Sequence, residues 1–292
     1  PPPNSRAARS TPDKMISEAE MFEQLARRVA TLSRPTFDHI VVDESQDVSV
    51  TRLRFLAALG GGRPNGLFFA GDLGQRIFQQ PFSWKGLGVD VRGRSTTLKV
   101  NYRTSHQIRG AADRLLPTVI RDVDVLADER KGTVSVFEGP EPLIALYQDE
   151  EAEIEAATKF LRALVAEGAG PGEIGVFVRD AARLPRARRA VEAAGLDFVE
   201  VSGQSASDGS RVSIGAMHFA KGLEFKAVVV MACDQDALPL RERVQAAGDE
   251  VELEDVYEGE RQLLYVACTR ARDRLFITGV APGSEFLADL QP

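Results

Sequence analysis

The sequence predicts an α/β protein with largely parallel sheets, and two observations support this class. Apolar runs typical of buried strands alternate with segments of helical periodicity along most of the 292 residues. Two of these runs are followed by acidic residues, Asp43 and Asp72, and a helical segment separates the two runs. A strand–helix–strand unit of this kind brings both acidic ends to one edge of a parallel sheet. No internal repeat is visible.

The composition is that of a globular protein long enough for two ordinary domains, with 43% hydrophobic and 27% charged residues. The net charge of −7 argues against a uniformly basic surface but leaves room for a local nucleic-acid groove. Cys233 and Cys268 lie in apolar runs, which favours buried free thiols over a disulfide or a metal site. No signal peptide and no apolar run of about 20 residues is present, so we expect a cytoplasmic protein without a membrane partner.

The first third of the chain predicts a disordered linker followed by part of a domain. Residues 1–12 are rich in Pro, Ser and Arg, which is typical of a linker. Residues 13–93 then form the first domain. Its expected elements are a helix over 15–32, a buried strand before Asp43, a helix over 49–59 and a buried strand over 66–70.

Residues 94–292 predict a second, larger domain. Its expected strands cover 98–102, 134–137, 174–178, 198–201, 212–216, 227–232 and 275–278. Its expected helices cover 104–116, 149–167, 182–194 and 258–271. We expect a polar loop over 202–210 and an exposed acidic excursion over 241–256.

Asp43 and Glu44 give the strongest local chemical signal. They follow an apolar strand, at the sheet edge where open α/β proteins bind ligands. Asp43 could hold Mg²⁺ through its water shell, and Glu44 could orient and deprotonate an attacking water. The same dipeptide also fits a strand that is followed by an ordinary polar turn.

A set of segments in a fixed order decides between these alternatives. The segments are VVDESQD (41–47), GDLGQRIF (71–78), LKVNYRTS (98–105), MHFAKGLEF (217–225) and LLYVACTRAR (263–272). Together they resemble motifs II to VI of the UvrD/Rep-like superfamily 1 DNA helicases, over residues 37–279. The resemblance implies two RecA-like lobes of the P-loop NTPase type, the first incomplete and the second complete. It also implies an ATP-dependent motor that moves 3′ to 5′ on DNA in replication or repair.

The resemblance implies roles for five residues in ATP hydrolysis. Asp43 corresponds to the Mg²⁺ ligand and Glu44 to the catalytic base. Gln75 corresponds to the γ-phosphate sensor, whose amide can donate to a phosphate oxygen and accept from water. Arg103 and Arg270 correspond to the arginines that reach the γ-phosphate from the second lobe. The planar, permanently charged guanidinium suits this task, and such arginines contribute about 10³–10⁵ in rate.

Three further residues would contact the nucleotide outside its phosphates. Glu224 corresponds to the glutamate that contacts the ribose, and Gly222 lies in the same short segment. Tyr102 could form part of the pocket for the base. A tyrosine in the hydrophobic core is the alternative for Tyr102.

Four residues are candidates for contact with DNA. Trp84, the single tryptophan, corresponds to a residue that stacks on a base, an interaction worth about 1–3 kcal/mol; a core tryptophan is the alternative. Lys85 stands where relatives carry arginine. His218 and Lys221 lie in the segment that couples nucleotide state to DNA, and Lys221 could contact either a phosphate or a carboxylate at the sheet edge. The expected partner is single-stranded DNA or a duplex with a single-stranded tail.

Two features of the family pattern are missing. The chain has no Gly-x-x-x-x-Gly-Lys-Ser/Thr phosphate loop, which in this family precedes motif II. We therefore expect an upstream segment to carry it, and expect this chain alone to be inactive. The large helical subdomain before motif V is replaced by the loop at 202–210. A non-catalytic DNA- or protein-binding module, or a DNA-dependent ATPase without processive unwinding, remains an alternative to a helicase.

Overall fold

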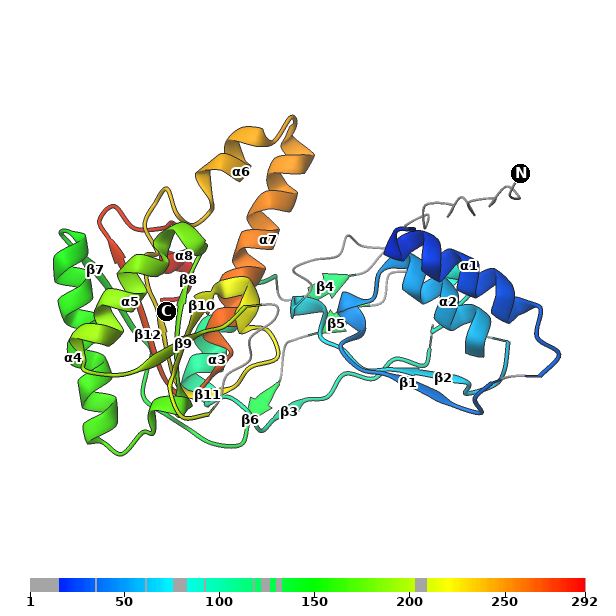
Figure 1. Cartoon of the computed structure of the whole chain (residues 1–292), viewed down its shortest axis with the longest axis horizontal. Coiled ribbons are helices and arrows are strands. Elements are labelled where there is room, and N and C mark those ends of the chain that lie inside the picture. Colours follow the sequence, from blue (N-terminus) through cyan, green and yellow to red (C-terminus); the bar gives the residue numbers. More distant parts are fainter. Residues whose placement is uncertain are drawn as a thin grey trace, which may run out of the picture.

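The computed structural model describes residues 16–34, 36–60, 62–75, 83–91, 93–117, 119–121, 127–129, 133–202 and 209–291. The predicted linker at 1–12, the end of the second motif and most of the loop at 202–210 lie outside these residues. The described elements form two lobes side by side along the long axis (Figure 1). Among them, no helix combines the length and the apolar character that crossing a membrane requires.

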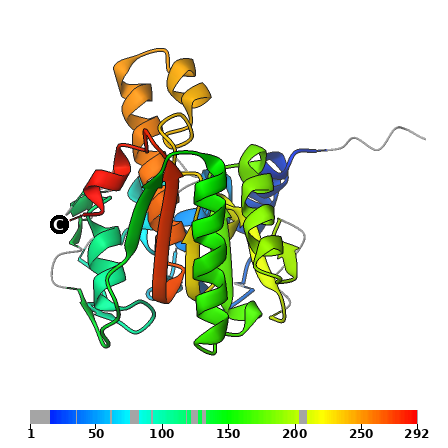
Figure 2. The same ribbon diagram turned by 90° about the vertical axis from the view of Figure 1, so that its left-hand side faces the viewer.

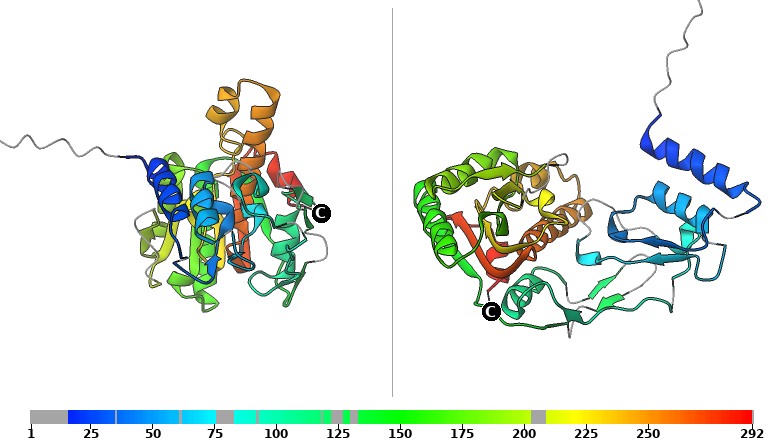
Figure 3. Two further views of the ribbon diagram at one scale, coloured as in Figure 1. Left: turned by 90° about the vertical axis from the view of Figure 1, so that its right-hand side faces the viewer. Right: turned by 60° about the horizontal axis from the view of Figure 1, so that its bottom comes forward.

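The first lobe is built in layers. Its elements are α1 (Glu18–Ala30), β1 (Ile40–Val42), α2 (Val50–Gly60) and β2 (Leu67–Phe69). β1 and β2 pair in parallel, α2 packs on them, and α1 lies on the outer side of α2 (Figure 3). A capping box at Ser17 and Glu20 starts α1, because each side chain accepts from the other residue's backbone amide.

The two strands of the first lobe are buried on one face only. Val42, Leu67 and Phe69 pack against the small core of this lobe. On the opposite face, Val41 is 72% exposed and Phe68 is 63% exposed, because no described element covers it. The prediction of buried strands is therefore wrong for that face.

The second lobe is a sheet sandwiched between helices. Its six strands are all parallel, in the order β7 (Leu143–Tyr147), β12 (Ala271–Val280), β11 (Phe225–Val230), β8 (Ile174–Val178), β10 (Val212–Ala216) and β9 (Phe198–Glu200). One face is covered by α4 (Glu150–Ala166) and α5 (Leu184–Ala193) (Figure 2). The other face is covered by α3 (His106–Asp113), α7 (Glu250–Cys268) and α8 (Phe286–Asp289).

Burial on both faces explains the sequence pattern of the central strands. Every residue of β8 and β10 is buried, so neither strand shows the alternation of a half-exposed sheet. Leu161 and Val191 fill the core layer under α4 and α5, and Ile108 and Leu264 fill the opposite layer. The predicted α/β class with a parallel sheet is confirmed in this lobe.

Short strands connect the two lobes. They are β3 (Val100–Asn101), β4 (Val119–Arg121), β5 (Ala127–Glu129) and β6 (Val134–Ser135). β3 pairs in parallel with β6, and β4 pairs antiparallel with β5. The strands predicted over 98–102 and 134–137 are thus present but shorter.

Short 3₁₀ helices occur in both lobes. They are η1 (Ser45–Asp47), η2 (Leu73–Gln75), η3 (Lys85–Leu87), η4 (Pro171–Glu173), η5 (Ala181–Arg183) and η6 (Met217–Ala220).

Several elements of the second lobe differ from the prediction, and among them the short helix α8 is absent from the predicted set. The edge strand β7 is absent from the predicted set. The segment expected as an exposed acidic excursion is mostly exposed, but it contains α6 (Arg241–Ala246) and the first two turns of α7. The Asp249 carboxylate caps the start of α7, where it accepts from the Glu252 amide at 2.8 Å. Such a cap and acidic residues in the first turn favour helix formation. α6 and the start of α7 project from the lobe (Figure 1).

The two cysteines are buried and free, as predicted. Both belong to the core layer between α7 and the sheet, and Cys268 is the last residue of α7. Burial raises the pKa of the Cys233 and Cys268 thiols, which keeps them protonated and unreactive at neutral pH.

Candidate functional site

A cleft of about 980 Å³ lies between the two lobes. Its walls come from the loop after β2, the connecting segment around β3, and the ends of β11 and α7. The predicted site residues that line it are Gln75, Trp84, Tyr102, Arg103, Glu224 and Arg270. Residues far apart in the sequence therefore meet here.

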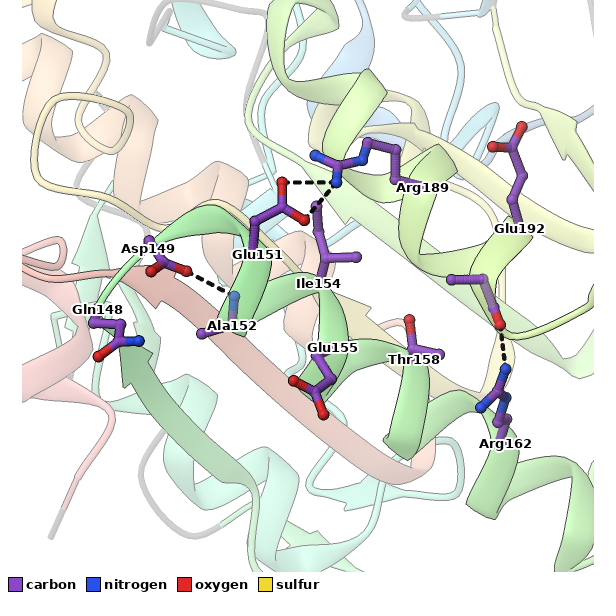
Figure 4. Close-up of a pocket in the computed structure, with 11 residues that line it drawn as sticks. Gln148, Asp149, Glu151, Ala152, Ile154, Glu155, Thr158, Arg162, Arg189 and Glu192 are labelled. Atoms are coloured by element: carbon purple, nitrogen blue, oxygen red, sulfur yellow. Dashed lines mark hydrogen bonds and ion pairs between the residues drawn. The ribbon is translucent and has the colours of Figure 1, made fainter.

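A second cavity, of about 830 Å³, lies between α4 and α5 on the outer face of the second lobe (Figure 4). Both of its arginines have partners within the cavity wall. Arg189 pairs with Glu151 at 2.6 Å, and Arg162 donates to the Ala193 carbonyl. No predicted site residue lines this cavity. The interlobe cleft is therefore the candidate site.

Asp43 and Glu44 leave β1 at its C-terminal end, as predicted, and both are exposed. Glu44 has left-handed backbone angles, φ 50° and ψ 42°, which are uncommon for a non-glycine residue and cluster at functional sites. Its amide donates to Asp43 Oδ1 at 2.8 Å. This hydrogen bond fixes the Asp43 carboxylate against the backbone of the turn.

Gln46 is not among the residues that the motifs predict for the site, although it lies inside the acidic motif. Its side chain is 1% exposed. Gln46 Nε2 donates to Glu44 Oε2 at 2.5 Å, and Gln46 Oε1 accepts from the Asp72 amide at 3.1 Å. The residue therefore joins the loop after β1 to the loop after β2. The signal in the sequence for this contact is Gly71-Asp72, which follows β2, the strand that pairs with β1.

Gln75 makes a bridge between the lobes. Its Nε2 donates to Asp72 Oδ2 at 2.9 Å, and its Oε1 accepts from Arg270 Nη2 at 3.1 Å. The Asp72 carboxylate is itself fixed, because Oδ1 accepts from the Gly74 amide at 2.9 Å. Both ends of the Gln75 amide are thus oriented.

Arg270 follows α7 and is buried, with 2% exposure. Its Nε donates to the Val266 carbonyl at 3.1 Å. Burial lowers the pKa of Arg270, and the nearby Arg103 acts in the same direction, while the carboxylates of Glu44 and Asp72 oppose them. An arginine keeps its charge in such surroundings. A buried cation at the wall of a cleft is well placed to receive an anion.

Arg103 forms an ion pair with Glu224 across the cleft mouth. Both side chains are about half exposed, at 47% and 56%. The Arg103 amide donates to Asn101 Oδ1 at 2.8 Å, which shapes the turn after β3. Tyr102 is 74% exposed, so the core alternative for this residue is excluded.

Lys221 contacts the first lobe. Its Nζ lies 2.6 Å from Asp47 Oδ1 and 2.6 Å from the Gln75 carbonyl oxygen. Of the two alternatives for Lys221, the structure shows the carboxylate contact. Gly222 follows with φ +78°, a conformation that favours glycine. Its predicted contact with the nucleotide stays a prediction.

The residues predicted to contact DNA occupy different environments. Trp84 is 6% exposed and meets Phe69 edge-on, with ring centroids 4.9 Å apart. This placement favours the core alternative, because the ring packs into the small core of the first lobe. Lys85 is exposed in η3, and His218 is half-buried beside Phe219. Burial and the nearby Arg179 lower the pKa of His218.

Asp43 is the residue that could hold a magnesium ion. The described residues contain no group of three or more His, Cys, Asp or Glu side chains suited to a metal. A nucleotide-bound Mg²⁺ needs only one or two protein carboxylates, because phosphates and waters supply its other ligands. One oxygen of Asp43 accepts from the Glu44 amide. This donor set fits magnesium that arrives with a nucleotide, rather than a dedicated protein cage.

A comparison with known protein families finds a match in the second lobe. Residues 191–281 match the family model of the UvrD-like helicase C-terminal domain. The match confirms the resemblance that the ordered motifs indicate. It runs from α5 to the end of β12 and includes Lys221, Glu224 and Arg270.

Curated relatives match over short segments. The "ATP-dependent DNA helicase UvrD1" of Mycobacterium leprae is 35% identical over 92 residues, which is 28% of this chain and 11% of that protein. The "ATP-dependent DNA helicase PcrA" of Staphylococcus aureus is 39% identical over 67 residues, which is 23% of this chain and 8% of that protein. The matches thus span about a tenth of these relatives.

A solved structure of the C-terminal domain of a possible DNA helicase from Lactobacillus plantarum is also similar. It is 22% identical, with a TM-score of 0.45, over 65% of this chain and 94% of that one.

Proposed function

We propose that this chain is the later part of an ATP-dependent DNA motor, with ATP bound in the interlobe cleft. The observation that carries the proposal is the meeting of Gln75 and Arg270, from opposite lobes, at 3.1 Å. Arg103 lines the same cleft. A polar sensor and two arginines around one opening suit the terminal phosphate of a nucleotide. The phosphate loop would come from an upstream segment of the same protein.

The residues of this chain would share the work of hydrolysis. Magnesium, held by Asp43, would neutralise charge on the phosphate oxygens. Glu44 would orient the attacking water and accept its proton as the water oxygen bonds to the γ-phosphorus and the bond to the β,γ-bridging oxygen breaks. Arg103 and Arg270 would stabilise the charge that develops in the transition state.

Coupling to DNA would work through the side-chain contacts at the cleft. Nucleotide entry would compete with the Gln75–Arg270 and Arg103–Glu224 contacts, because the phosphates and the ribose seek the same side chains. Breaking and remaking these contacts would open and close the cleft. Lys85 and His218 are the candidates for strand contact. The 3′ to 5′ direction, the preference for DNA and a role in replication or repair rest on the family resemblance.

The first test is magnesium-dependent ATP hydrolysis, with and without single-stranded DNA. It compares this chain with a protein extended upstream through the phosphate loop. We expect DNA-stimulated turnover in the extended protein only, and a fall of about 10²- to 10⁴-fold in its rate with Glu44→Gln. The matched control is Glu155→Gln, which changes an exposed glutamate that pairs with Lys159 on α4. An undiminished rate with Glu44→Gln would overturn the assigned base, and inactivity of the extended protein would favour a binding module.

A further inference from the structure

We propose that Gln46 is a positioning residue for Glu44, and that it connects this carboxylate to the arginine of the opposite lobe. The inference rests on the proposed function, in which Glu44 is the base. The Gln46 amide uses both of its ends within the site. Nε2 donates to Glu44 Oε2 at 2.5 Å, and Oε1 accepts from the Asp72 amide at 3.1 Å.

Burial makes the orientation of Gln46 specific. The side chain is 1% exposed, and a buried amide that loses its partners costs free energy. If the amide were flipped, its NH₂ would face the Asp72 N–H and its carbonyl would face the Glu44 carboxylate. Both contacts would be repulsive. The amide therefore has one favourable orientation, and in it the NH₂ group holds the carboxylate.

Glu44 needs such support because of its own position. It lies on an exposed turn with left-handed backbone angles, outside any regular helix or strand. Its neighbour Asp43 contacts the Glu44 backbone amide and does not restrain the Glu44 carboxylate. Gln46 supplies that restraint from the buried side of the turn. A base that must meet a water in one geometry gains from a fixed direction.

The hydrogen bonds continue from Gln46 to the second lobe. Gln46 holds the backbone of Asp72, the Asp72 carboxylate accepts from Gln75, and Gln75 accepts from Arg270. Glu44 and Arg270 are therefore the two ends of one chain of contacts. A movement of Arg270 toward a bound phosphate would release Gln75, and so change the restraint on Asp72 and Gln46.

Gly71 makes the close approach of Gln46 feasible. A Cβ at this position would lie 2.5 Å from Gln46 Oε1 and 2.5 Å from Ser45 Oγ. No Cβ tolerates such distances, so one of these groups would have to move. Gly71→Ala thus offers a way to displace Gln46 without altering its chemistry.

The test is a double-mutant cycle on ATP hydrolysis in the extended protein. Gln46→Met keeps the size of the side chain and removes both hydrogen bonds. We expect kcat to fall about 10- to 100-fold, with the KM for ATP unchanged within about twofold. In a Glu44→Gln background, Gln46→Met should have less than about a twofold further effect, because residues that act as a unit are not additive. Gly71→Ala should lower kcat in the same way.

Controls separate positioning from general damage. Gln148→Met changes a glutamine at the outer cavity (Figure 4) and should leave kcat unchanged. Urea unfolding followed by Trp84 fluorescence shows whether each variant folds. If Gln46→Met does not fold, Gln46→Glu replaces it. That variant keeps the acceptor for Asp72, loses the donor to Glu44, and should also lower kcat.

The outcomes are distinguishable. Hydrolysis by the unmodified extended protein, with kcat of a folded Gln46 variant within about twofold of it, overturns the positioning role alone. An equal loss in the parent and in the Glu44→Gln background also overturns it, because the effect would not pass through the Glu44 carboxylate. Absence of hydrolysis in the unmodified extended protein overturns the proposed function and the positioning role with it.

Discussion

Lys221 of the second lobe places its Nζ 2.6 Å from Oδ1 of Asp47, the last residue of the acidic motif in the first lobe. The lysine is 10% exposed and the aspartate 33% exposed, so solvent screens the pair only in part. The same Nζ donates to the Gln75 carbonyl. A single side chain thus contacts both loops that carry the predicted catalytic residues of the first lobe.

Loss of this contact should loosen the two lobes. We expect Lys221→Met to increase the radius of gyration measured by small-angle X-ray scattering. A double-mutant cycle with Asp47→Asn should give a coupling free energy of about 1–2 kcal/mol, because a charged hydrogen bond is lost. Lys159→Met is the control, since Lys159 pairs with Glu155 on the surface of α4. An unchanged radius together with zero coupling would show that the pair does not hold the lobes.

The buried Glu260 should be essential for the stability of the second lobe. It is fully buried and accepts from Arg179 through two nitrogens, from Arg243 at 2.9 Å and from the Leu240 amide at 3.3 Å. Glu260→Ala leaves the buried Arg179 uncompensated, so we expect a loss of about 3–5 kcal/mol in the free energy of unfolding.

Urea denaturation monitored by circular dichroism measures this loss. The matched control is Glu258→Ala, an exposed position on the same helix, which should stay within about 0.5 kcal/mol of the parent. Similar values for the two variants would mean that the buried pair contributes no more than a surface charge.

Trp84 should affect stability rather than DNA affinity. Its side chain fills the first-lobe core beside Leu53 and Phe69. We expect Trp84→Ala to lower the free energy of unfolding by about 3–5 kcal/mol, while a folded sample binds a labelled single-stranded oligonucleotide with unchanged affinity. Trp84→Phe, which retains an aromatic ring, should lose less stability. Weaker oligonucleotide binding at unchanged stability would instead support base stacking.

His218 should make folding less favourable in mild acid. Burial, and secondarily Arg179, lowers the pKa of His218 in the folded state. As the pH falls through about 6.5, the unfolded chain takes up a proton at this residue while the folded chain does not. Stability attributable to the neutral ring is therefore present above that pH and decreases below it.

Removing the titrating ring tests this prediction. His218→Gln should flatten the fall in unfolding free energy between about pH 7 and pH 5. His106→Gln changes an exposed histidine on α3 and serves as the control. If both variants show the same pH dependence as the parent, burial of His218 does not govern acid sensitivity in this range.

The sequence predicts elements best where the burial is complete. β8 and β10 match their predicted bounds because all of their side chains face a core. β7 is harder to predict, since Leu143 and Leu146 are about half exposed at the sheet edge. The start of α7 is likewise obscured, because it projects into solvent and carries acidic rather than apolar residues.

The residues of the candidate site also differ in how well the sequence predicts their positions. The motifs predict that Gln75, Arg103 and Arg270 converge, and the structure brings all three to one cleft. The role of Gln46 depends on a contact between loops that follow different strands, which residue spacing does not reveal. The burial of Trp84 depends in the same way on its packing against Phe69.

The most direct measurement is a crystal structure of the upstream-extended protein with magnesium and a non-hydrolysable ATP analogue. The proposed function predicts the nucleotide in the interlobe cleft, with the guanidinium groups of Arg103 and Arg270 on its terminal phosphate and Asp43 at the metal. Nucleotide bound elsewhere, or an unchanged Arg270–Gln75 contact and Arg103–Glu224 pair beside a bound nucleotide, would contradict it.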